Sequence, residues 1–262
     1  MENLGEIKKT VTFLGKPNEG KAEFNATGFL VSIQNIVHLI TAKHVIVDKS
    51  GMFKDNNMVV FFNIKGGEIG GRQIEEIKKR FGVDWIFHEN DEVDIAIIPL
   101  AVDLQRDDVR TIPENIFLDM NSSLELCDIF SLSFQPGILS PKRIMPIIRN
   151  GTISLVNEDG TFYIDAPAYP GNSGSPVFIK PSPIRFDAGS VQIGRDSIGG
   201  KFVGIIGEFL TYSEVAVSTQ TLRPRIIFEE NTGLSKVWSV RFLKGITESS
   251  AFKEQLEKIV GK

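Results

Sequence analysis

Short runs of β-branched and aromatic residues, separated by Gly, Pro, Asn and Asp, dominate the pattern of hydrophobic and polar positions along the chain. Runs of this kind, bounded by turn residues, are typical of β-strands. The Asp159-Gly160 pair predicts a tight hairpin within the run Thr152–Ile164. Many short strands at this spacing predict a sandwich or barrel. The runs are Phe29–Ile33, Val37–Thr41, Met58–Phe62, Ile95–Ile98, Thr152–Ile164 and Lys201–Leu210.

Helical signals are confined to two segments. Arg72–Arg80 fits either one short helix or a charged edge strand. At the end of the chain, Phe252, Leu256, Ile259 and Val260 recur at helical spacing. They predict a docked amphipathic helix over about 249–260, with Ser249 or Ser250 as its N-cap.

The pattern divides the chain into two β-rich halves, each about the size of a small closed barrel. Ala101–Asn121 is polar, contains proline and is interpreted as the connector between them. We therefore expect one unit over 1–112 and a second over 113–262. Two stretches, Pro181–Gly200 and Thr211–Gly233, are interpreted as long loops.

Composition narrows the class of protein. The net charge of −4 disfavours nonspecific nucleic-acid binding, which needs a basic surface. No apolar run is long enough to suggest a membrane span, and the N-terminal residues do not form a signal peptide. The single cysteine, Cys127, rules out an intrachain disulfide and is expected to be a buried structural residue. We expect a cytoplasmic protein without a cofactor.

Three local motifs carry chemistry, in the order histidine, acid, serine. His44 follows an apolar strand that ends near Ala42. Asp94 opens the apolar run Ile95–Ile98, and Ser173 lies in the glycine-framed segment Gly171–Pro176. A serine hydroxyl is a weak nucleophile that needs a base beside it, and imidazole has a suitable pKa. A buried carboxylate then fixes the tautomer of the imidazole.

The same types of residue elsewhere have simpler interpretations. Asp91 and Glu92 compete with Asp94, but only Asp94 directly opens the apolar run. His38 alternates with its strand and is expected to be a core residue. His88 lies in a polar turn beside Glu89, where a metal site is disfavoured because ligands so crowded in sequence rarely converge.

These motifs together resemble the chymotrypsin-fold (trypsin-like) serine peptidases, and among them the bacterial HtrA/Deg type. The resemblance extends over roughly Ala26–Ile259. It implies an all-β fold of two six-stranded antiparallel barrels with a C-terminal helix. It also implies endopeptidase activity on peptides or proteins. The stretches that carry it are Ala26–Val31, Thr41–His44, Asp94–Ile98, Leu126–Gly137, Asn150–Ser154 and Ile164–Gly174.

The resemblance also assigns roles to residues. His44, Asp94 and Ser173 would be catalytic, and the N–H groups of Gly171 and Ser173 would form the oxyanion hole. Substrate-binding residues would be Pro167, Ala168, Tyr169, Pro170, Gly207 and Glu208. No acid stands where trypsin-like enzymes bind Lys or Arg, so we expect selectivity for small or medium apolar side chains. An inward-pointing Glu208 would upset this expectation; the simpler interpretation is a solvent-facing side chain.

Departures from the family pattern leave a second hypothesis open. Asn172 replaces the Asp used in zymogen activation, and Ser175 stands where the family usually has Gly. The chain ends after the helix, so PDZ-gated regulation is not carried over. Because Ser175 and the two long loops could obstruct the cleft, the alternative is a gated or inactive protein-binding module. An α/β-hydrolase is disfavoured, since its Gly-x-Ser-x-Gly motif and its triad order are both absent.

Overall fold

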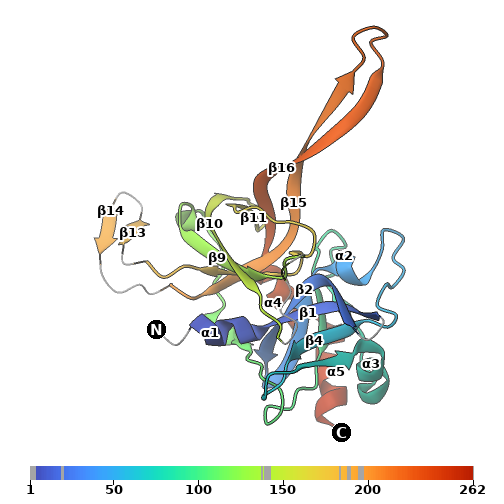
Figure 1. The fold of residues 1–262 in the computed structure, drawn as a ribbon. Coiled ribbons are helices and arrows are strands. Elements are labelled where there is room, and N and C mark those ends of the chain that lie inside the picture. The colour runs from blue at the N-terminus through green and yellow to red at the C-terminus, as the bar shows by residue number, and fades with distance from the viewer. Residues whose placement is uncertain are drawn as a thin grey trace.

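The computed structural model describes residues 4–18, 21–136, 138, 143–182, 184–187, 190–193 and 198–261. Two β-structures pack against each other, and helices lie at both ends of the chain (Figure 1). Within the described residues, no helix has the length and apolar character needed to cross a membrane.

The first β-structure is an eight-stranded sheet from the N-terminal half of the chain. Its main path runs β5-β4-β1-β2-β3-β7-β6, and β8 pairs in parallel with β2. It therefore has more strands than the six expected. The strands are β1 (Val11–Asn18), β2 (Lys21–Ile33), β3 (Ile36–Thr41), β4 (Val59–Asn63), β5 (Ile69–Gln73), β6 (Ile86–Phe87), β7 (Ala96–Pro99) and β8 (Ile112–Pro113).

The second β-structure is a closed barrel with the order β10-β11-β16-β15-β12-β9, as expected for a chymotrypsin-like unit. The hairpin predicted at Gly160 is confirmed: the residue has φ +89° and links β10 to β11. The chymotrypsin-like fold class is thus confirmed. The barrel strands are β9 (Asp128–Ser133), β10 (Ile147–Val156), β11 (Thr161–Asp165), β12 (Pro176–Ile179), β15 (Phe202–Val217) and β16 (Pro224–Ser239).

The largest cluster of buried side chains joins the two β-structures. It includes Phe29 from the first sheet and Phe178 and Phe202 from the barrel. The rings of Phe29 and Phe202 have centroids 5.4 Å apart. This shared core fixes the two β-structures relative to each other, so loops from both can contribute to one site.

The C-terminal helix is confirmed as α5 (Ser250–Val260). Ser249 is its N-cap, and its hydroxyl accepts a hydrogen bond from the backbone N–H of Phe252. Phe252 packs on the ring of the fully buried His38, which confirms that this histidine is a core residue. A preceding helix, α4 (Val240–Glu248), was not predicted.

The ambiguous segment around Arg72–Arg80 contains both alternatives in succession. Strand β5 ends at Gln73, and helix α3 (Ile74–Phe81) follows directly. Gly82, with φ +68°, ends the helix in the left-handed conformation that glycine adopts readily.

The interpretation of Thr211–Gly233 as a long loop is wrong. β15 and β16 continue beyond the barrel as a paired hairpin that projects from the body (Figure 1). Pro181–Gly200 contains a small two-stranded sheet, β13 (Ile184–Asp187) and β14 (Ser190–Ile193); residues 183, 188–189 and 194–197 lie outside the described part.

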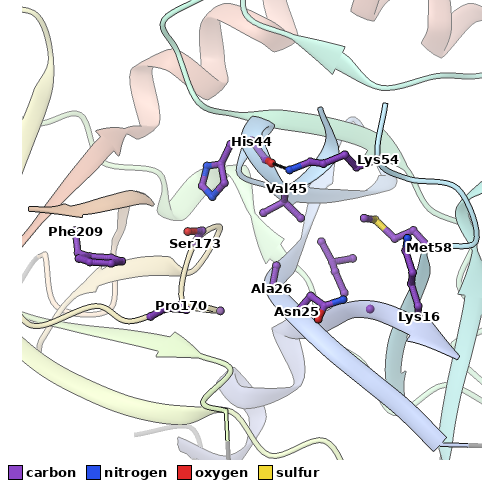
Figure 2. Close-up of a pocket in the computed structure, with 13 residues that line it drawn as sticks. Lys16, Asn25, Ala26, His44, Val45, Lys54, Met58, Pro170, Ser173 and Phe209 are labelled. Atoms are coloured by element: carbon purple, nitrogen blue, oxygen red, sulfur yellow. Dashed lines mark hydrogen bonds between the residues drawn. The ribbon is translucent and has the colours of Figure 1, made fainter. Parts of the chain in front are cut away.

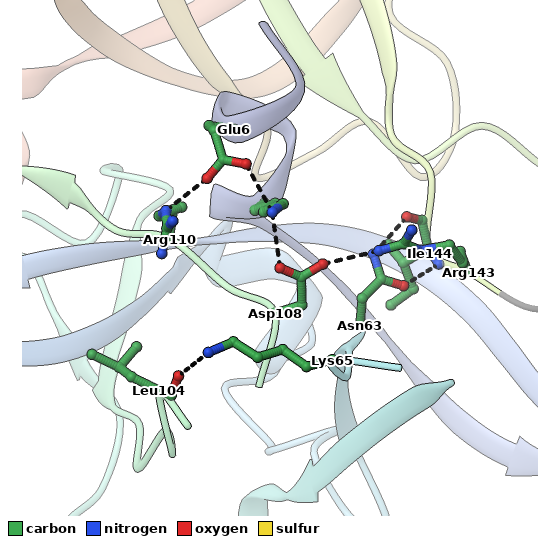
Figure 3. A network of polar contacts seen from close by, with 9 residues as sticks. Glu6, Asn63, Lys65, Leu104, Asp108, Arg110, Arg143 and Ile144 are labelled. Carbon is green, nitrogen blue, oxygen red and sulfur yellow. Dashed lines mark hydrogen bonds and ion pairs between the residues drawn. The ribbon is translucent and has the colours of Figure 1, made fainter. Parts of the chain in front are cut away.

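A polar network fastens the N-terminal helices, α1 (Leu4–Ile7) and η1 (Lys8–Thr10), to the connector (Figure 3). Lys9 pairs with Glu6 at 2.8 Å and with Asp108 at 2.9 Å, and Asp108 also binds Arg143. The hydrogen bond with Lys9 lowers the pKa of the Glu6 carboxyl. Asn63 exchanges two hydrogen bonds with the backbone of Ile144, so the segment before β10 is held against the first sheet.

Candidate active site

His44 and Asp94 meet because their strands are neighbours. β3 and β7 pair antiparallel, with Thr41 opposite Ala96. The chain leaving β3 and the chain entering β7 therefore meet at one end of the sheet. His44 follows there on the single helical turn α2 (Lys43–Ile46), and Asp94 lies just before β7.

Asp94 holds His44 through both carboxylate oxygens. Its Oδ2 lies 2.7 Å from Nδ1 of the imidazole, and its Oδ1 accepts the backbone N–H of His44 at 2.8 Å. Asp91 instead pairs with Lys43, and its side chain is 99% exposed, while Glu92 is also exposed. Of the three acids considered, Asp94 is the one that contacts the imidazole. This contact leaves Nε2 as the ring atom available to a nucleophile.

The segment carrying Ser173 is a tight turn built around Asn172. The fully buried Asn172 side chain accepts a hydrogen bond from the N–H of Tyr169 at 2.9 Å and donates one to the carbonyl of Phe134. The backbone N–H of Asn172 donates to the carbonyl of Tyr169, and its backbone carbonyl accepts the N–H of Ser175. Asn172 therefore holds the turn from within, without a charged partner.

Thr27 joins this turn to the first sheet. Its buried hydroxyl donates to the carbonyl of Gly171 at 2.7 Å and accepts the N–H of Phe134 at 2.9 Å. Its backbone N–H also donates to the carbonyl of Ser173 at 3.3 Å. One residue of β2 thus fixes the carbonyls on both sides of Asn172.

The backbone N–H groups of Gly171 and Ser173 donate to no acceptor among the described residues. Gly171 has φ +93°, and a Cβ there would lie 2.8 Å from the ring of Phe134. Only glycine satisfies both the backbone conformation and the space. Two neighbouring unpaired N–H groups are what an oxyanion hole requires.

Gly174 brings the turn close to the first sheet. It has φ +84°, and a Cβ there would lie 2.3 Å from the carbonyl oxygen of Thr27. Gly174 therefore allows the turn to lie directly against the first sheet. Behind it, the Ser175 side chain is fully buried, and its hydroxyl has no partner among the described residues.

His44 and Ser173 line one cavity of about 480 Å³ between the two β-structures (Figure 2). The imidazole and the serine side chain lie side by side in this view, with Phe209 and Pro170 to one side. No hydrogen bond joins Ser173 to His44 in the described part of the chain. Catalytic hydrogen bonds of this type often tighten only when substrate is bound.

Several lining residues were not predicted from the sequence. Phe209 belongs to β15 and directly follows Gly207 and Glu208, which were expected to bind substrate. Met58 and Lys54 both lie in the loop between α2 and β4, and Lys54 Nζ donates to the carbonyl of His44. Nothing in the local sequence around Lys54 indicates this contact, because it depends on how the loop after α2 folds back.

The expected substrate-binding residues do not all reach this cavity. Pro170 lines it, whereas Ala168 is buried in the core of the barrel. Tyr169 is 43% exposed and packs under the guanidinium of Arg149, 5.0 Å from the ring centroid. Burial lowers the pKa of Arg149.

Gly207 and Glu208 lie where β15 leaves the barrel. A Cβ on Gly207 would lie 2.6 Å from the indole nitrogen of Trp238 and 3.5 Å from the Asp94 carboxylate, so glycine keeps the space beside the acid open. Glu208 points outward: its side chain is 67% exposed and lies 3.8 Å from Lys236. The inward-pointing Glu208 that would upset the apolar expectation is therefore not observed.

The chain matches the model of the trypsin-like peptidase domain over residues 26–180. It belongs to the trypsin-like peptidase family. The match contains His44, Asp94 and Ser173 together with Thr27. No curated protein sequence matches the chain.

Three of the solved structures that share this fold are serine proteases. A serine endoprotease from Yersinia pestis superposes with a TM-score of 0.53 at 14% identity, covering 94% of this chain and 64% of that one. A thermostable serine protease from an extremophilic microorganism gives 0.52 at 13%, covering 92% and 96%. The protease Anisep from Arthrobacter nicotinovorans gives 0.50 at 13%, covering 93% and 95%. At these identities, the likeness establishes the fold.

Proposed function

We propose that this member of the trypsin-like peptidase family is a serine endopeptidase that cleaves peptide bonds through an acyl-enzyme on Ser173. The observation that carries the proposal is the bidentate contact of Asp94 with His44, beside a cavity that Ser173 also lines. A carboxylate on Nδ1 selects the tautomer whose Nε2 can accept a proton.

In the proposed reaction, Ser173 Oγ attacks the carbonyl carbon of the substrate while its proton passes to His44 Nε2. The Gly171 and Ser173 N–H groups donate to the oxyanion of the tetrahedral intermediate. The imidazolium then protonates the leaving amine as the C–N bond breaks. Water, deprotonated by His44, releases the acid and regenerates Ser173.

The selectivity that we propose is for small or medium apolar side chains. Glu208 supports it by pairing with Lys236 outside the cavity. The apolar side chain of Phe209 beside Pro170 also suits such a substrate. The HtrA/Deg-like character and the cytoplasmic location rest on the sequence and stay predictions.

The gated-module alternative is not favoured. One of its two motivating loops, Thr211–Gly233, is a hairpin that projects away from the body rather than a flap over the cavity (Figure 1). Hydrolysis of casein and of a peptide library by the wild type, Ser173→Ala and the exposed-site control Ser213→Ala tests the proposal. We expect loss of hydrolysis in Ser173→Ala alone; equal hydrolysis by all three proteins would refute the assignment.

A further inference from the structure

The outer half of the β15–β16 hairpin has large apolar side chains that no described part of the chain covers. It projects from the barrel as a two-stranded ribbon (Figure 1). An isolated two-stranded hairpin is marginally stable in water, and clustered exposed apolar side chains mark interaction sites. The side chains, each more than half exposed, are Tyr212, Val215, Val217, Leu222, Ile226, Ile227 and Phe228.

Strand β16 also has a free edge along this half. On its outer side, β16 pairs with β11 only through Leu234–Trp238. The segment Pro224–Gly233 pairs with β15 on its inner side and with no other described strand. The N–H and C=O groups of such an edge are a template for a further strand.

The sequence of this edge is complementary to itself. If two copies of β16 pair antiparallel about Ile227, that residue lies opposite Ile227 of the second copy. Ile226 then lies opposite Phe228 of the second copy, and Arg225 lies opposite Glu229 of the second copy. The pairing is symmetric, so the Ile226–Phe228 pair and the Arg225–Glu229 pair each occur twice, and the Ile227 pair on the axis occurs once. Opposite charges and apolar residues facing each other across strands are the stabilising combinations.

The ends of the paired segment agree with this register. Arg225 lies in the register shift near the end of the hairpin ladder, between the pairs Ala216–Ile226 and Val217–Pro224. The preceding residue, Pro224, has no N–H to donate, so it ends the stretch of β16 that can pair with a second copy. The outer half of β15, Thr211–Val217, has one charged residue, Glu214, so no register of two such segments sets opposite charges against each other.

We propose that the hairpin is a dimerisation arm, and that two copies of the chain pair their β16 strands antiparallel about Ile227. The product is a continuous four-stranded sheet with β15 of each copy at its outer edges. A symmetric two-fold contact of this kind closes on itself and does not propagate into a fibre. The inference does not depend on the proposed peptidase activity.

Charge exchange at Arg225 and Glu229 tests the register. Sedimentation velocity of the full chain over a concentration series is expected to show a monomer–dimer equilibrium for the wild type. Arg225→Glu and Glu229→Arg each place like charges opposite each other, and we expect each to weaken dimerisation about tenfold or more. An equimolar mixture of the two variants restores both opposite-charge pairs, so we expect a heterodimer.

Controls separate this contact from misfolding and from other contacts. Glu214→Arg changes a charge on β15 and should leave dimerisation unchanged, and the thermal unfolding of every variant reports on folding. A wild type that stays monomeric at the highest soluble concentration would overturn the proposal. So would single variants that dimerise like the wild type, or a mixture that stays monomeric.

Discussion

Replacing Thr27 with valine should disable the nucleophile turn while leaving the fold in place. Valine keeps the shape of threonine but lacks the hydroxyl that donates to Gly171 and accepts from Phe134. Both partner groups are then left unsatisfied, at about 1–3 kcal/mol each where they are buried. For a chain of this size, the melting temperature falls by roughly 2–4 °C per kcal/mol, so the two groups together predict a loss of roughly 4–24 °C.

We also expect the substitution to slow catalysis. Without the Thr27 hydroxyl, the Gly171 carbonyl is no longer fixed. The N–H group of Gly171 then loses its alignment as an oxyanion donor. We expect kcat to fall about 100-fold with little change in KM, since misaligned or missing donors have costs of this order. The assay is peptide hydrolysis at a temperature where each variant is folded.

Two variants make this prediction specific to the hydroxyl. Thr27→Ser keeps the hydroxyl and should retain kcat close to the wild type. Thr12→Val removes a buried hydroxyl that has no partner among the described residues, and should change neither kcat nor stability by much. The reasoning is refuted if folded Thr27→Val keeps the wild-type kcat, or if Thr27→Ser loses as much activity as Thr27→Val.

Three further predictions follow from the site and the core. Asp94→Asn should lower kcat about 10,000-fold in the hydrolysis assay, because the tautomer of His44 is no longer fixed; a loss below tenfold would count against its role. Glu208→Gln should leave the preference of a peptide panel unchanged, whereas strong cleavage after Lys or Arg would contradict the apolar preference. Burial lowers the pKa of His38 from 6.5 to about 4. The unfolded chain therefore binds the proton more readily between these values, and stability should fall by up to about 3 kcal/mol as the pH drops through that window. Unfolding curves of His38→Phe should lack this dependence; an unchanged pH profile would contradict it.

The candidate catalytic residues could be predicted because each lies in a local pattern next to the end of a strand. The apolar runs before His44 and after Asp94 are both strands, and their pairing, Thr41 opposite Ala96, brings the two side chains together. The glycines around Ser173 marked the turn in the same way. By contrast, the hydrogen bonds of Thr27 cross between the two β-structures, and no local signal in the sequence records such a contact.

The hairpin was missed because its outer half does not alternate between buried and exposed positions. Val215 and Ile226 lie on a ribbon with solvent around it, so no period-two pattern of burial develops. Turn residues such as Gly233 also made the sequence of this segment look like that of a loop, and the hairpin contains register shifts that interrupt its pairing. Helix α4 was missed because it is short and contains Gly245, which lowers helix propensity.

The identity of the reacting serine tests the central claim most directly. The wild type, Ser173→Ala and His44→Ala are incubated with a fluorophosphonate, and the site of any adduct is located by peptide mass spectrometry. We expect one adduct, on Ser173 of the wild type, with no labelling of Ser173→Ala and greatly slowed labelling of His44→Ala. An adduct on another residue, or labelling of Ser173→Ala at the wild-type rate, would contradict it.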